Sequence, residues 1–131
     1  MSAGQREIVV LAVGQANACQ HCLSAHGLLG KYAGLSESAI LNARAGKSAK
    51  PLENALAVLV VKIAQRRGVL PDDDLAIAHT AGMGDGLIIE IVANVVLDIP
   101  SNHTNHIAAT DVELPTVKID LSANTQADYV R

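Results

Sequence analysis

Both cysteines of the chain lie within one stretch of eight residues, together with two of its five histidines. The stretch reads Cys19-Gln20-His21-Cys22-Leu23-Ser24-Ala25-His26. On a helix, the spacings from Cys19 to Cys22 and from Cys22 to His26 place side chains on one face. A helix N-terminus stabilises a thiolate, and a nearby imidazole can accept the thiol proton. The pattern predicts a redox-active dithiol, in which an oxidised cysteine condenses with its neighbour to a disulfide.

Metal binding is the alternative chemistry for this stretch. Cys19, Cys22 and His26 are three side chains of the kind that bind zinc, and His21 or Glu7 could supply a fourth ligand. A structural zinc site usually takes its other ligands from a separate pair, and the chain has no second CxxC. A thioredoxin-type site is disfavoured because no strand of a βαβ unit precedes the cysteines. Redox chemistry is therefore preferred to metal binding and to inert thiols.

The composition indicates the scaffold that holds these residues. The chain has 131 residues, half of them apolar, and its only aromatic residues are two tyrosines. A core of Ala, Val, Leu and Ile lets helices approach closely but buries little area per residue, so such chains often gain stability by association. We expect one all-α domain over residues 1–131, a compact bundle of about six helices. Its core spans about residues 5–115, and residues 116–131 form an extended or mobile tail.

Charge and hydropathy exclude several classes of partner. The net charge is −3 with no basic stripe, so the electrostatic signature of a nucleic-acid binder is missing. No secretory signal is recognisable, and the longest apolar run, Leu87 to Ile99, is interrupted by Glu90, Asn94 and Asp98. We therefore expect a cytoplasmic protein with no nucleic-acid or membrane partner. In that compartment, closely spaced cysteines are typically catalytic or metal-binding.

Hydrophobic periodicity and capping residues predict the helices. The first is apolar without a break from Ile8 to Val13, which indicates burial on all sides. Pro100 is expected to kink or break the longest helix. An alternating segment from Val117 to Leu121 indicates an extended chain or an edge strand. The expected helices span residues 5–17, 20–32, 37–44, 51–67, 71–82, 85–96 and 101–109.

A polar stripe runs along the longest predicted helix and continues beyond Pro100. Its members recur every four residues: Glu90, Asn94, Asp98, Asn102 and His106. Such a stripe on an apolar helix is more often a solvated or inter-subunit face. The functional interpretation is that Asn102, Asn105 or His106 lines a pocket over the thiols.

The residues of the first stretch resemble the redox-active branch of the alkylhydroperoxidase D/carboxymuconolactone decarboxylase superfamily. That branch carries Glu, eleven residues, Cys, two residues, Cys, three residues and His, and Glu7, Cys19, Cys22 and His26 have this spacing. A histidine just before the second cysteine is also found there, as His21 is here. Further similar segments are Arg6-Glu7-Ile8, Ala33-Gly34-Leu35-Ser36, Glu90-Ile91-Val92-Ala93 and Thr104-Asn105, so the resemblance covers roughly residues 5–115.

The resemblance implies an all-α bundle that assembles into a homo-oligomer, a trimer or hexamer. It also implies that Glu7, His26 and a water form a proton relay to Cys22, with His21 assisting. Cys22 would attack a peroxide and Cys19 would resolve the intermediate as a disulfide. An external dithiol or lipoyl-type donor would reduce that disulfide, with no bound cofactor. Many relatives carry about two further helices before the segment that matches Glu7.

Two other functions fit the same sequence. A carboxymuconolactone decarboxylase-like carbon-acid enzyme would need a general acid and base but no thiols. A non-enzymatic redox-sensing or metal-binding oligomer would use the dithiol without turnover. Glu7 also has a structural explanation, because a glutamate in the first helical turn is stabilised by the helix dipole.

Overall fold

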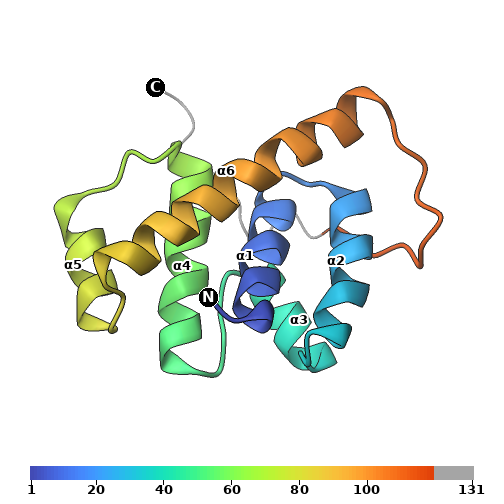
Figure 1. Ribbon diagram of the computed structural model, residues 1–131. Helices are drawn as coiled ribbons and strands as arrows, with labels where there is room; N and C mark the ends of the chain where they lie inside the picture. The colour runs from blue at the N-terminus through green and yellow to red at the C-terminus, as the bar shows by residue number, and fades with distance from the viewer. Residues whose placement is uncertain (120–131) are drawn as a thin grey trace.

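The computed structural model describes residues 1–119, which form six helices and no strand (Figure 1). The all-α prediction is therefore confirmed. The helices are α1 (Ala3–Ala16), α2 (Gln20–Tyr32), α3 (Glu37–Arg44), α4 (Pro51–Arg66), α5 (Asp72–Thr80) and α6 (Asp85–Ile107).

Helix α1 is the centre of the bundle. Figure 1 shows it between α4 on one side and α2 with α3 on the other, while α6 crosses over it. Its apolar side chains are inaccessible to solvent almost all round, as the unbroken run from Ile8 to Val13 predicted. Ser2 begins this helix with a capping box, in which its hydroxyl accepts a hydrogen bond from the backbone N–H of Gln5. The central position of α1 brings its C-terminal end against the first turn of α2.

Helix α6 corrects one prediction, because it runs unbroken through Pro100 to Ile107. Proline lacks an N–H, so the carbonyl of Val96 receives no hydrogen bond from position 100. Pro100 and Val96 are both exposed, which lets water satisfy that carbonyl. The single helix therefore carries Asp98, Asn102 and Asn105 in one register to the N-terminal end of α2.

The segment that follows α6 folds back across α2 without forming a strand. The amide of Gln20 donates to the carbonyl of Val117 at 3.0 Å, and the N–H of Val117 donates to Ser24 Oγ at 3.4 Å. Arg44 also donates to the carbonyl of Lys118. The edge-strand alternative is therefore wrong up to residue 119, and the rest of the predicted tail lies outside the described residues.

No single helix within residues 1–119 has the length and apolar composition needed to cross a membrane. Only α5 and α6 taken together pass that test, as a pair bent by 116°.

Gly46 is expected to be the glycine least tolerant of substitution. Its φ is +68°, and a Cβ at this position would lie 2.8 Å from Cγ2 of Val61. Gly46→Ala should therefore lower the free energy of unfolding by about 1–3 kcal/mol, measured by denaturant titration. Gly27→Ala is the matched control, since Gly27 lies within α2 with nothing near its Cβ position. That variant should be more stable by about 0.5–1 kcal/mol, and equal effects in the two variants would contradict the assignment.

Candidate active site

The turn between α1 and α2 places both cysteines at the start of α2. Ala18 adopts a left-handed conformation with φ of +55°, and the N–H of Cys19 donates to the carbonyl of Gly14 at 2.9 Å. Cys19 is the N-cap of α2, and its Sγ accepts a hydrogen bond from the N–H of Cys22 at 3.3 Å. The two sulfurs form a disulfide, and the two residues are only 1% and 4% exposed. The positive end of the helix thus faces the sulfur of Cys19.

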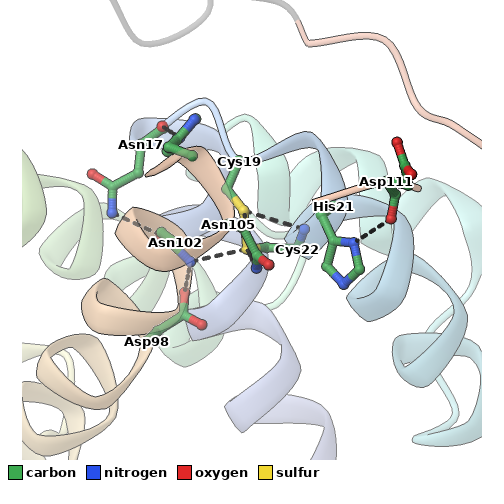
Figure 2. Close-up of a disulfide and its surroundings, with 9 residues drawn as sticks. Asn17, Cys19, His21, Cys22, Asp98, Asn102, Asn105 and Asp111 are labelled. Atoms are coloured by element: carbon green, nitrogen blue, oxygen red, sulfur yellow. Dashed lines mark hydrogen bonds between the residues drawn. A yellow bond between two sulfur atoms is a disulfide. The ribbon is translucent and has the colours of Figure 1, made fainter. Parts of the chain in front are cut away.

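Two asparagines of α6 contact the sulfurs from the other side (Figure 2). The amide nitrogen of Asn102 lies 3.2 Å from Cys22 Sγ. The amide nitrogen of Asn105 lies 3.5 Å from Cys22 Sγ and 4.0 Å from Cys19 Sγ. Cys22 Sγ therefore accepts hydrogen bonds from two side chains. The closer donor, Asn102, bonds Cys22 and not Cys19, whereas Asn105 reaches both sulfurs.

The amide of Asn102 is held by a buried polar network. Its nitrogen also donates to Asp98 Oδ2 at 3.2 Å, and its oxygen accepts a hydrogen bond from the amide of Asn17 at 2.8 Å. Asn102 is completely buried, and Asp98 is 8% exposed. The solvated-face interpretation of the polar stripe is therefore wrong for these two residues. Figure 2 shows Asp98, Asn102 and Cys22 in succession, with Asn17 at the opposite end of the Asn102 amide.

Burial raises the pKa of the Asp98 carboxyl above its ordinary value. The hydrogen bond from Asn102 and the nearby His26 oppose this rise in the pKa, and the charge of Glu7 adds to it. A raised pKa in the folded state means that folding favours the protonated carboxyl. This contribution to stability is complete below the ordinary pKa and is lost as the pH rises through the folded-state pKa.

Asp98→Asn should therefore be more stable than the parent protein, by an amount that grows with pH. The difference should increase across the acidic range and level off above the folded-state pKa of Asp98. Each pKa unit corresponds to about 1.4 kcal/mol. Denaturant unfolding of both proteins from about pH 3 to pH 7 measures this difference, and other titrating groups are common to both proteins and largely cancel. A difference that stays constant over this range would contradict the prediction.

The structure also brings Glu7 and His26 together. His26 Nδ1 lies 2.9 Å from Glu7 Oε2, and this contact joins α2 to α1. Both side chains are mostly buried, with 26% exposed for His26 and 18% for Glu7. Within residues 1–119, no hydrogen bond joins His26 to either sulfur. Within the same residues, the Glu7–His26 pair and the cysteine pair are therefore not joined by a hydrogen bond.

His21 lies apart from this pair. Its Nδ1 lies 3.3 Å from the carbonyl of Asp111, in the segment after α6, and Figure 2 shows the ring directed toward it. His106 Nε2 lies 2.9 Å from the carbonyl of Asn17, so it anchors the end of α6 to the α1–α2 turn. Neither histidine hydrogen-bonds a sulfur in the described part of the chain.

Sequence reasoning missed Asn17 and Asp98 as members of this site. Asp98 had a signal, because it precedes Asn102 by one helical turn in the polar stripe. Asn17 had none beyond its place as a helix stop. Across residues 1–119, no three His, Cys, Asp or Glu side chains gather as a metal site would require. A groove of about 710 Å³ lies between α1, α4 and α6, and neither cysteine lines it.

Comparison with known proteins supports the fold. No family model matches the sequence, and no curated protein matches it. The structure is similar to a crystal structure described as an alkylhydroperoxidase AhpD core, an uncharacterized peroxidase-related protein from Ralstonia eutropha JMP134. The TM-score is 0.72 at 19% sequence identity, over 88% of this chain and 60% of the other. The chain therefore has an AhpD-like fold and spans about 60% of the length of that structure.

Proposed function

We propose that this AhpD-like chain is a thiol-dependent peroxidase that reduces organic hydroperoxides. The observation that carries the proposal is the Cys19–Cys22 disulfide at the N-terminus of α2. Hydrogen-bond donors surround this disulfide: the N–H of Cys22 on one sulfur, and the amides of Asn102 and Asn105 on the other. Donors of this kind bind a thiolate more strongly than a neutral thiol, which favours the nucleophilic form.

The proposed cycle balances as follows. The thiolate of Cys22 attacks the terminal oxygen of the hydroperoxide, the O–O bond breaks, and the alkoxide leaves as an alcohol after taking a proton. The resulting sulfenic acid of Cys22 reacts with the thiol of Cys19, which forms the S–S bond and releases water. An external dithiol then reduces the disulfide by two electrons and becomes a disulfide itself.

Glu7 and His26 are proposed as the acid–base pair of this cycle. The hydrogen bond at 2.9 Å fixes the ring of His26 through Nδ1 and leaves Nε2 to exchange a proton. Because His26 makes no direct hydrogen bond to Cys22 within residues 1–119, a water completes the proposed relay to the sulfur. His21 is assigned an assisting role only, since its described partner is the carbonyl of Asp111.

The oligomeric state, the localisation and the electron donor of the chain are also proposals. We infer a cytoplasmic homo-oligomer, a trimer or hexamer, that receives electrons from a dithiol or lipoyl-type donor. Several apolar side chains of α6 support self-association because a monomer would leave them in water: Ile89 (67% exposed), Val96 (56%), Leu97 (75%) and Ile107 (88%). Light scattering of the purified chain measures the oligomeric state directly.

The decisive experiment is thiol titration of the fully reduced protein with one equivalent of an organic hydroperoxide. Both thiols should disappear rapidly, one alcohol should form per disulfide, and a dithiol reductant should restore both thiols. Because the chain has only two cysteines, the titration reports this pair alone. Thiols that remain reduced for hours would contradict the proposal.

A redox sensor is the second candidate, and the burial of the disulfide favours it. Cys19 and Cys22 are 1% and 4% exposed, so a reductant must displace some of the covering side chains before it reaches either sulfur. A sensor would be oxidised once by peroxide and would turn over poorly with every dithiol supplied. Multiple turnovers with a small dithiol would exclude the sensor and support the peroxidase.

A further inference from the structure

We propose that Asn102 is a catalytic residue that stabilises the thiolate of Cys22, and that Asp98 and Asn17 are positioning residues that fix its amide. The inference rests on the proposed dithiol cycle and identifies Cys22 as the sulfur that carries negative charge. It concerns Asn102 and Asp98 of α6, which lie far in sequence from the CxxC stretch, and Asn17, the C-cap residue of α1.

The orientation of the Asn102 amide follows from its two other partners. The NH₂ of Asn102 donates to Asp98 Oδ2 at 3.2 Å, and a carboxyl oxygen can accept this hydrogen bond whether or not the group is ionised. The oxygen of the amide then faces Asn17, which donates to it at 2.8 Å. With the amide fixed in this way, the second hydrogen of the NH₂ is directed to Cys22 Sγ at 3.2 Å.

The contact distinguishes the two cysteines. Asn102 contacts the sulfur of Cys22 alone, whereas Asn105 lies between both sulfurs at 3.5 and 4.0 Å. Asn102 is fully buried, so water does not compete for its hydrogen. A buried donor to sulfur strengthens when the sulfur becomes negative, and it therefore favours the thiolate over the thiol.

The other charged and titratable side chains around Cys22 are the same in the parent and in the Asn102→Ala variant used below. Glu7 reaches the region from α1 and His26 from α2, paired at 2.9 Å. His21 bonds the carbonyl of Asp111, and His106 bonds the carbonyl of Asn17. Asp98 lies on the opposite side of the Asn102 amide from Asn17. A single neutral substitution at position 102 removes the donor without adding a charge.

The test measures the rate of iodoacetamide alkylation of Cys22 against pH, in the reduced full chain carrying Cys19→Ser. Asn102→Ala should slow alkylation about tenfold at neutral pH and move the pH profile to higher pH, while the rate at high pH is retained. Asn94→Ala is the control, because Asn94 lies two turns earlier on α6 and donates, within residues 1–119, to the carbonyl of Glu90 and not to a sulfur. An unchanged profile in a folded Asn102→Ala variant would overturn the proposal.

An exchange variant keeps the test decisive if Asn102→Ala does not fold. Asp98→Asn combined with Asn102→Asp preserves the composition, the hydrogen bond between positions 98 and 102, and the one to Asn17. The donor at Cys22 is replaced by a carboxylate, which cannot donate and which also brings a negative charge next to the sulfur. Alkylation should then slow by more than tenfold at neutral pH, and a parent-like rate would refute the role of Asn102. Because the assay contains no peroxide, a chain that fails to turn over hydroperoxide can still confirm or refute this inference.

Discussion

Replacing Cys22 with serine is expected to lower hydroperoxide turnover by about 1,000-fold or more, because the hydroxyl cannot serve as the nucleophile at neutral pH. Cys19→Ser should abolish steady-state turnover while still consuming close to one equivalent of peroxide, since the first oxidation needs only Cys22. Steady-state assays with an organic hydroperoxide and a dithiol measure the first effect. Mass spectrometry of the oxidised Cys19→Ser variant should show sulfenic acid or its further oxidation products.

Gln20→Ala is the control for these variants. Gln20 lies between the two cysteines and is exposed, and its side chain donates to the carbonyl of Val117. Its loss should leave turnover within about twofold of the parent. Full activity in Cys22→Ser would refute the peroxidase proposal, and lactone turnover in a chain lacking both cysteines would favour a decarboxylase-like enzyme on the same fold.

Local chemistry explains why most of the fold could be predicted. Ser36 caps α3 by accepting from the N–H of Ala39 at 3.2 Å, as an N-cap serine should. Pro51 begins α4 and is compatible with its first turn. These signals act over three or four residues, so the sequence contains everything needed to place them. The effect of Pro100 was misjudged. A break in the helix would cost more than the one hydrogen bond that proline removes, because that bond lies on an exposed face where water can satisfy the free carbonyl.

The cysteine site could be predicted only in part, because its two halves are far apart in the sequence. The CxxC pair and its helix N-terminus arise from consecutive residues. Asn102 is 80 residues from Cys22 and Asn17 is 85 residues from Asn102, and both contacts depend on how α6 crosses α1. A polar stripe indicates which residues share a helix face but not whether that face meets water or the core. Burial of Asp98 and Asn102 is set by that crossing.

Glu7→Gln is expected to lower kcat/KM for hydroperoxide about 100-fold, because the amide cannot stabilise a protonated His26 as the carboxylate does. Glutamine keeps the shape and one hydrogen bond to His26 Nδ1, so the variant removes charge rather than packing. The rate of the first oxidation by peroxide, followed by stopped flow, should fall in parallel. The melting temperature should change little.

Glu53→Gln provides a closely matched control for this effect. The side chain of Glu53 is 17% exposed and paired with Lys50, whereas that of Glu7 is 18% exposed and paired with His26. The two variants therefore remove carboxylates of nearly equal burial, one paired with His26 at the site and one paired with Lys50 on α4. Equal activities would mean that Glu7 only holds α1 against α2, since Glu7 lies beyond the first turn of α1 and the predicted helix-dipole explanation is wrong. A selective loss in Glu7→Gln would assign the carboxylate to proton transfer, because no difference in exposure remains to explain it.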